Sequence, residues 1–164
     1  MKILKFVLPY ILPLILFSQE NSESKIKYWD TQRKGANCFN YTVSPAWFTA
    51  AKEINIQFAR IATDKWLCEK RDFLIGDADS FIEISQQDLK TLIAVLDQAE
   101  LNNIKVVITF LSLPGSRWKQ NNENCDDLRI WKEKKYQNQA IAFWKTLASL
   151  LKNHPAIAGY NILN

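Results

Sequence analysis

Several side chains that could bind a ligand or assist catalysis lie where predicted strands end. Arg60 lies inside the apolar run "FARIA", and Asn37 lies in the first predicted strand. Trp66 and Trp118 follow the second and third strands, and Asn164 ends the fourth. In parallel α/β folds, functional side chains gather at the carboxyl ends of the strands. We therefore expect the candidate site at this end of the sheet.

Arg60 gives the sharpest signal, because a guanidinium within a buried strand is costly unless it has a partner. Two interpretations are open for it: a structural ion pair with a neighbouring element, or the orientation of a catalytic carboxylate. Trp66 and Trp118 are also open to two interpretations. Exposed loop tryptophans can stack on the apolar faces of sugar rings, but they can also cover a core.

Hydrophobic periodicity predicts the elements that would position these side chains. Continuous apolar runs predict four strands, at residues 36–39, 58–62, 104–111 and from 157 onward. Helical spacing predicts three helices, at residues 45–54, 85–101 and 139–152. Such alternation predicts parallel strands joined by right-handed helical crossovers, and therefore an α/β fold.

The same patterns predict details of packing and capping. Ile93 and Ile141 fall on the apolar faces of the second and third helices, and Ser85 and Asp88 resemble a capping box. His154 is expected to cap the C-terminal end of the third helix. Three tryptophans are expected in the core: Trp47, Trp131 and Trp144.

The composition is that of a globular domain with a modest basic excess. The chain has 164 residues, of which 48% are apolar, and a net charge of +4. No stripe of basic and aromatic residues follows one element, so nucleic acid is not an expected partner. No glycine-rich phosphate loop follows a strand, and His154 is the only histidine. We expect neither a cofactor nor a metal ion.

The N-terminus has the pattern of a targeting segment. Two lysines precede an apolar run at residues 6–17, and the small residue Ser18 follows. This is typical of a cleaved signal peptide, although an uncleaved anchor or a buried helix is an alternative. We expect a secreted or periplasmic protein with a signal peptide at 1–18, a flexible leader at 19–33 and a domain at 34–164. Export permits a disulfide, so one bridge or buried thiols are open for Cys38, Cys68 and Cys125.

Four segments, taken in chain order, resemble glycoside hydrolase family 5, the cellulase and mannanase family. The segment "KGANCFN" resembles its first-strand motif, and "NIQFARIATDKW" resembles its second strand. The segment "DLKTLIAVLDQAELNNIKVVITFLSLPGS" is similar to its second helix, third strand and Pro-Gly turn. Finally, "HPAIAGYNILN" resembles its fourth strand. The resemblance covers residues 34–164.

This resemblance implies a TIM-type (β/α)8 barrel, of which the chain would supply the first four strands, a half barrel. It implies a retaining glycosidase that hydrolyses β-linked polysaccharides with two glutamates. Arg60 would match the arginine that keeps the nucleophile ionised, and Asn164 the asparagine that bonds the sugar 2-hydroxyl. Both glutamates would lie beyond residue 164, so we expect no catalytic residue within the chain, no hydrolysis by it alone, and a C-terminal half as partner.

Two positions depart from the family's pattern. Two alternatives to a glycoside hydrolase are also open, a binding fragment and an unrelated domain. Leu111 stands where the family has a histidine that contacts the sugar, and Lys34 stands where it has an arginine. A non-catalytic or decayed fragment could bind poly- or oligosaccharides through Arg60, Trp66 and Trp118. Alternatively, a small unrelated α/β domain could close its own sheet with four parallel strands.

Overall fold

The structure is a computed structural model, and it describes residues 25–40, 42–63 and 72–163. The chain divides into two units, residues 1–32 and 33–164. The described part of the first unit contains a 3₁₀ turn, η1, at Tyr28–Asp30. The expected signal peptide lies outside the described residues. Within the described residues, no helix has both the length and the hydrophobicity that crossing a bilayer requires.

The second unit is built on a parallel sheet of four strands in the order β1-β2-β5-β6. These strands are β1 (Gly35–Cys38), β2 (Phe58–Ala62), β5 (Lys105–Thr109) and β6 (Ile157–Asn161). All neighbouring pairs are parallel, and the register between β5 and β6 shifts between Val106 and Val107. The predicted α/β class and its four parallel strands are confirmed.

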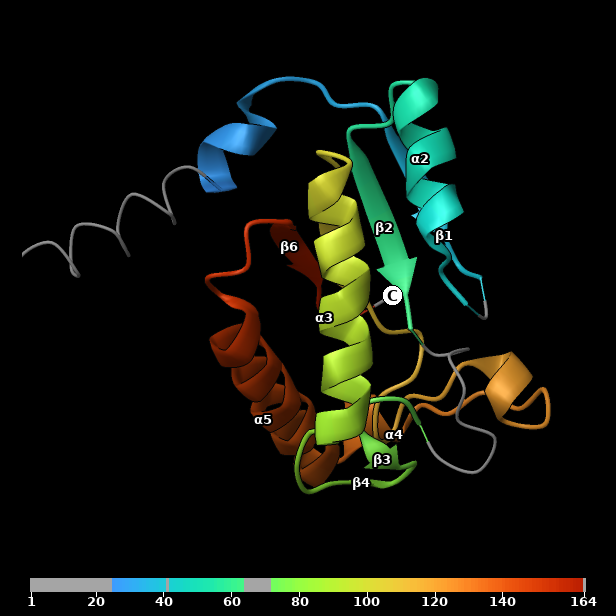
Figure 1. The fold of residues 1–164 in the computed structure, drawn as a ribbon. Helices are drawn as coiled ribbons and strands as arrows, with labels where there is room; N and C mark the ends of the chain where they lie inside the picture. The colour runs from blue at the N-terminus through green and yellow to red at the C-terminus, as the bar shows by residue number, and fades with distance from the viewer. Residues whose placement is uncertain (1–24, 41, 64–71, 164) are drawn as a thin grey trace, which may run out of the picture. The chain divides into compact units, whose positions relative to one another are not determined.

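Three helices connect successive strands: α2 (Pro45–Glu53), α3 (Gln86–Leu101) and α5 (Lys134–Leu151). Figure 1 shows all three on the same face of the sheet. Shorter elements lie in the loops that follow β2 and β5: β3 (Gly76–Asp77), β4 (Ser80–Phe81), η2 (Lys119–Asn121) and α4 (Arg129–Lys132). Each of these loops therefore carries structure of its own beyond the end of its strand.

Local sequence explains where the helices begin and end. Pro45 occupies the first turn of α2, where its fixed φ is already helical. The hydroxyl of Ser85 accepts a hydrogen bond from the backbone N–H of Asp88 at 3.4 Å, which confirms half of the expected capping box. The carboxylate of Asp88 accepts from the N–H of Leu74 at 2.8 Å, and the N–H of Ser85 donates to the carbonyl of Leu74 at 3.3 Å. After α3 ends at Leu101, Asn103 adopts the left-handed conformation, with φ 57°.

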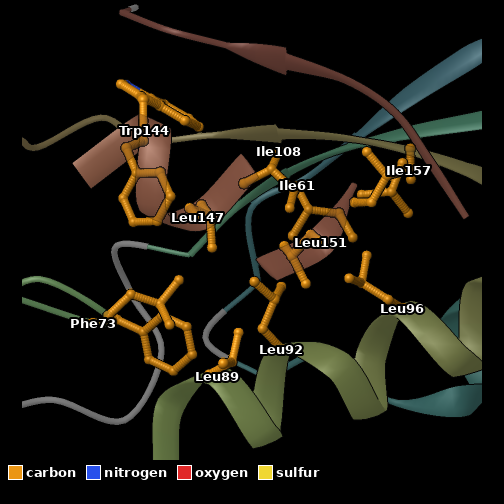
Figure 2. Packing of buried hydrophobic residues seen from close by; sticks show 14 of the residues in the cluster. Ile61, Phe73, Leu89, Leu92, Leu96, Ile108, Trp144, Leu147, Leu151 and Ile157 are labelled. Carbon is orange, nitrogen blue, oxygen red and sulfur yellow. The ribbon is translucent and has the colours of Figure 1, made fainter. Parts of the chain in front are cut away.

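The hydrophobic core lies between the sheet and the helices (Figure 2). Strand residues Ile61, Ile108 and Ile157 are buried there against helix residues. The helices contribute Leu89, Leu92, Leu96, Trp144, Leu147 and Leu151. The ring of Phe110 packs edge-on against Phe143 at a centroid distance of 4.8 Å. Since the core occupies one face of the sheet, the alternate strand residues point to the other face.

Some predictions of burial were wrong. Trp131 is 67% exposed, because it lies on the single turn of α4 and not on a long amphipathic helix. Ile93 and Ile141 are also exposed, because each lies at the margin of an apolar face whose centre is Leu92 or Ala140. Trp144 is buried as predicted, and Trp47 packs against the core while partly exposed.

The ends of α5 also differ from the prediction. The helix begins at Lys134 and not at Gln139, and the added first turn buries Tyr136. The imidazole of His154 does not act as the expected helix cap. Its Nε2 lies 3.2 Å from the carboxylate of Asp97, and its Nδ1 accepts from the N–H of Ala156. His154 therefore ties the end of α5 to α3.

Candidate functional site at the carboxyl end of the sheet

The face of the sheet opposite the helices carries a group of polar strand residues. By register, Asn37 of β1 lies beside Arg60 of β2, and Thr109 of β5 lies beside Asn161 of β6. Side chains at paired positions of parallel strands point to the same face. Thr109 and Asn161 are the last residues of their strands, whereas Arg60 is the middle residue of β2 and reaches both through its side chain.

Arg60 is held by two neutral side chains. Its Nε and Nη2 donate to the side-chain oxygen of Asn161 at 3.1 and 2.7 Å. Its Nη2 also lies 3.4 Å from the hydroxyl of Thr109, and that hydroxyl donates to the same Asn161 oxygen at 3.0 Å. The guanidinium lies 5.3 Å from the centre of the Phe39 ring, a cation–π distance. These contacts fix the guanidinium through an amide oxygen, a hydroxyl and an aromatic ring.

Both roles considered for Arg60 involve a carboxylate, whereas these contacts are to amide and hydroxyl oxygens. A structural ion pair and the orientation of a catalytic carboxylate therefore both stay predictions. Asn161 and Thr109 were missed by the sequence reasoning. Strand alternation could have found them, because each follows a residue of the core face, Tyr160 or Ile108, by one position.

Two of the other predicted site residues, Asn37 and Trp118, lie among the described residues. Asn37 is exposed beside Arg60, so these two are brought together. Trp118 is half-buried on the loop that follows β5, and its backbone N–H donates to the hydroxyl of Ser112 at 3.1 Å. Trp66 and Asn164 lie outside the described residues.

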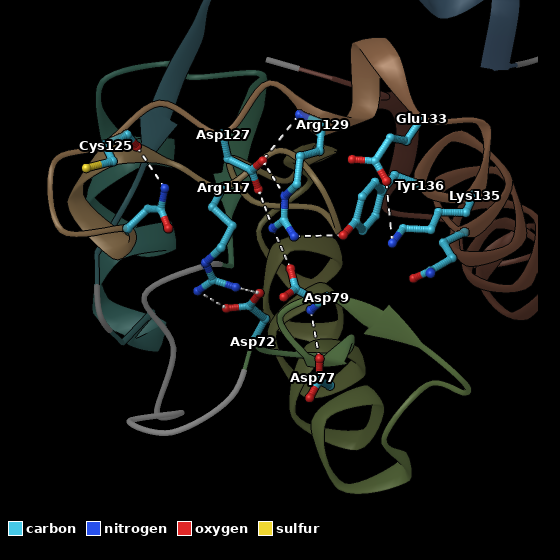
Figure 3. A network of polar contacts seen from close by, with 12 residues as sticks. Asp72, Asp77, Asp79, Arg117, Cys125, Asp127, Arg129, Glu133, Lys135 and Tyr136 are labelled. Atoms are coloured by element: carbon cyan, nitrogen blue, oxygen red, sulfur yellow. Dashed lines mark hydrogen bonds and ion pairs between the residues drawn. The ribbon is translucent and has the colours of Figure 1, made fainter.

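A chain of charged side chains joins the loop after β2 to the loop after β5 (Figure 3). We call it the rim network, and it consists of Asp72, Asp79, Arg117, Asp127 and Arg129. The guanidinium of Arg117 makes a bidentate pair with Asp72, at 2.7 and 3.1 Å. The two side chains are 15% and 12% exposed, so the pair is largely shielded from water.

Arg129 is the centre of the other half of the network. Its Nε and Nη2 donate to the two carboxylate oxygens of Asp127 at 2.8 and 2.9 Å, and Nη2 also pairs with Asp79. Its Nη1 donates to the hydroxyl of Tyr136 on α5 at 2.7 Å. The hydrogen bond from Arg129 holds the pKa of Asp127 below its usual value. The paired carboxylates raise the pKa of Arg129 in turn.

Two of the three cysteines lie among the described residues. Cys38 and Cys125 are free thiols, buried and exposed respectively, while Cys68 lies outside the described residues. Burial raises the pKa of the Cys38 thiol. Across residues 25–40, 42–63 and 72–163, no three His, Cys, Asp or Glu side chains group so as to hold a metal ion.

Four parallel strands in sequential order, with their connecting helices on one face, have the architecture of half a (β/α)8 barrel. No family model matches the chain, and no curated protein matches its sequence. Solved structures do match its fold. A crystal structure of a glycoside hydrolase has a TM-score of 0.62 at 16% identity, covering 82% of this chain and 42% of that one.

Two further structures show the same partial correspondence. The endoglucanase Cel5A of Pseudomonas stutzeri has a TM-score of 0.52 at 21% identity, with 74% of this chain and 33% of that chain covered. Aphid myrosinase has a TM-score of 0.51 at 11% identity, with 73% and 23% covered. The chain thus spans less than half the length of each of these structures. At such identities the likeness is one of fold, that of part of a TIM-barrel glycoside hydrolase.

Proposed function

We propose that the chain is the N-terminal half of a glycoside hydrolase of family 5 type that acts on a β-linked polysaccharide. The observation that carries the proposal is the Arg60 guanidinium, fixed by Asn161 and Thr109 at the carboxyl end of the sheet. Support also comes from the fold likeness to glycoside hydrolases and from the four resembling segments in their order.

The chemistry of the proposal divides between this half and a C-terminal half. A retaining glycosidase needs two carboxyl groups about 5 Å apart, one as nucleophile and one as acid and base. A fixed guanidinium beside the nucleophile lowers its pKa and keeps it ionised, and that role is proposed for Arg60. Asn164 is proposed to bond the sugar 2-hydroxyl. Because both glutamates are assigned to the C-terminal half, these 164 residues alone should not hydrolyse a glycan.

The coding DNA after the Asn164 codon tests the assignment of the glutamates. We expect a glutamate codon next, followed by a second glutamate on a later predicted strand. If no reading frame carries them, the hydrolase assignment is wrong, and a glycan-binding or decayed fragment becomes the better account. We further propose an exported protein; recovery of the full-length product only inside the cell, with residues 1–18 still attached, would contradict export.

Activity and binding assays test whether this half binds a glycan without hydrolysing it. The purified chain should release no reducing sugar from soluble β-glucan or β-mannan above a heat-treated control. It should nevertheless migrate more slowly in native gels that contain its glycan, and Arg60→Ala should weaken this retardation. Sugar release by the chain alone would contradict the assignment of both glutamates to the C-terminal half. Unchanged migration in both glycans would contradict a glycan as the ligand.

A further inference from the structure

Trp118 and the residue before it, Arg117, are held in place by hydrogen bonds and an ion pair. Its own N–H donates to the hydroxyl of Ser112, a residue that is only 1% exposed. The preceding residue, Arg117, is fixed twice: its guanidinium pairs with Asp72, and its backbone N–H donates to the carboxylate of Asp127. Residues 117 and 118 are therefore held by three partners, two through their backbone N–H groups and one through the Arg117 side chain.

The loop after β2 fixes the first of these partners. Asp72 closes a tight turn with Gly76 through two backbone hydrogen bonds of 2.8 and 2.9 Å. Phe73 and Leu74, between them, are buried in the core, and the N–H of Leu74 donates to Asp88 in the first turn of α3. Because its turn is anchored in the core, Asp72 holds the guanidinium of Arg117 at a fixed place relative to the core.

The second partner is fixed from the side of α5. Asp127 is held by both Nε and Nη2 of Arg129, and Arg129 in turn contacts the hydroxyl of Tyr136. The ring of Tyr136 packs against Gly115, in the turn just before Arg117. Figure 3 shows Asp79, Asp127 and Tyr136 directed at the guanidinium of Arg129.

We propose that the rim network presets the ring of Trp118 as a stacking platform for one sugar unit of a β-linked glycan. Arg117, Asp72 and Asp127 are then positioning residues, since they act through Trp118. This inference rests on the proposed function and adds to it the groups that preorganise the platform. A side chain that is already ordered does not pay for its ordering when the glycan binds, and affinity rises accordingly.

Fluorine NMR of the full chain labelled with 5-fluorotryptophan tests the positioning without any glycan. Trp118→Phe assigns the resonance of Trp118. In Asp127→Asn and Asp72→Asn we expect this resonance to shift or broaden while the buried Trp144 resonance stays in place. Arg117→Lys keeps the charge but loses the bidentate pair, so it should have the same effect in a chain that keeps its fold. Asp97→Asn, whose partner is His154, is the matched control.

Soluble β-glucan and β-mannan then test the ligand. The Trp118 resonance of the wild-type chain should move on addition of the glycan that binds. Asp127→Asn, Asp72→Asn and Arg117→Lys should weaken that binding about 3- to 10-fold, the usual cost of reordering one side chain. Asp97→Asn should bind as the wild type does.

The possible failures are distinguishable. An unmoved Trp118 resonance in all three network variants overturns the positioning role, whether or not a glycan binds. Binding by the wild-type chain that leaves the Trp118 resonance unmoved overturns the platform but not the proposed function. No binding of either glycan, together with a displaced Trp118 in the variants, overturns the proposed function and the sugar as the platform's ligand.

Discussion

Arg60 and Asn161 are joined across the sheet although β5 lies between their strands. The Asn161 oxygen accepts from two guanidinium nitrogens, at 3.1 and 2.7 Å, and from the Thr109 hydroxyl of the intervening strand, at 3.0 Å. One amide oxygen therefore ties β2, β5 and β6 together on the face opposite the core. The same contacts fix the guanidinium near the last residues of β5 and β6.

Removing this oxygen should destabilise the chain. Asn161→Ala removes the oxygen that accepts two hydrogen bonds from the half-buried guanidinium of Arg60, and a hydrogen bond to a charged group contributes about 1.5–3 kcal/mol. We expect the free energy of unfolding to fall by about that amount. Urea unfolding followed by circular dichroism measures it, and the slope against urea should not change, because the surface exposed on unfolding stays the same.

Two further variants separate the hydrogen bonds from the loss of an asparagine. Asn138→Ala, on the exposed face of α5, should leave stability unchanged or raise it slightly. Asn161→Asp keeps an acceptor and offers Arg60 an ion pair, so it should be more stable than Asn161→Ala. A loss in Asn161→Ala no greater than in Asn138→Ala would show that the Arg60 contacts contribute nothing to stability.

The sheet and its helices could be predicted because their burial is periodic. The run around Ile108 is apolar on consecutive positions, and Leu89, Leu92 and Leu96 recur at helical spacing. Both patterns follow from the geometry of one element, which a single sequence records. Arg60 stood out for the same reason, as a charge inside such a pattern.

The rim network could not be predicted, because it depends on how two irregular loops meet. Asp72 and Arg117 are 45 positions apart, and nothing local to either one specifies the other. Trp131 was misassigned for a related reason: the turn of α4 is short, and a tryptophan on it need not face the core. Asn161 was missed because the family resemblance pointed to Asn164, the last asparagine of the same segment.

Asp127 should make the stability of the chain depend on acid pH. The hydrogen bond from Arg129 holds its pKa below the usual value of 3.8, which the unfolded chain should show. The stabilisation is therefore complete above the unfolded pKa and is lost as the pH falls through the folded one. The difference in free energy of unfolding between wild type and Asp127→Asn should be constant from pH 5 to 7 and shrink below about pH 4.

Its neighbour in sequence provides the control for this prediction. Asp126 pairs with Lys119 at 3.0 Å, but both side chains are more than half exposed. Such a surface pair contributes about 0–1 kcal/mol, and Asp126→Asn should change stability by no more than that at any pH. An Asp127 difference that persists unchanged to pH 2, or that Asp126→Asn reproduces, would argue against the Arg129 pair as its source.

The two described cysteines should differ in reactivity. Cys125 is exposed, whereas Cys38 is 1% exposed and burial raises its pKa, which lowers the fraction of reactive thiolate. In a Cys68→Ser background, DTNB at pH 8 should modify Cys125 rapidly in the native chain. Cys38 should react only at the rate at which the chain opens, and 6 M urea should abolish the difference. Cys125→Ser identifies the fast thiol, and equally fast reaction of Cys38 in the native chain would contradict its burial.

Two glycines with similar backbone angles should differ in what a side chain costs. Gly115 and Gly76 have φ of 76° and 91°, so alanine is strained by about 1–3 kcal/mol at either position. A Cβ at Gly76 meets nothing within 4 Å, whereas a Cβ at Gly115 would overlap the ring of Tyr136. Gly115→Ala should therefore cost about 1–3 kcal/mol more than Gly76→Ala, because the ring must also move.

Displacing the ring of Tyr136 should also disturb the rim network. Tyr136 accepts a hydrogen bond from Arg129, so Gly115→Ala should also weaken the hold of Arg129 on Asp127. In the urea and pH measurements, Gly115→Ala combined with Asp127→Asn should then lose less stability than the sum of the two single changes. A Cβ at Gly76 would not touch Tyr136, so Gly76→Ala should couple to Asp127→Asn less than Gly115→Ala does. Equal costs for the two alanines, or full additivity for both, would show that Tyr136 can yield without disturbing Arg129.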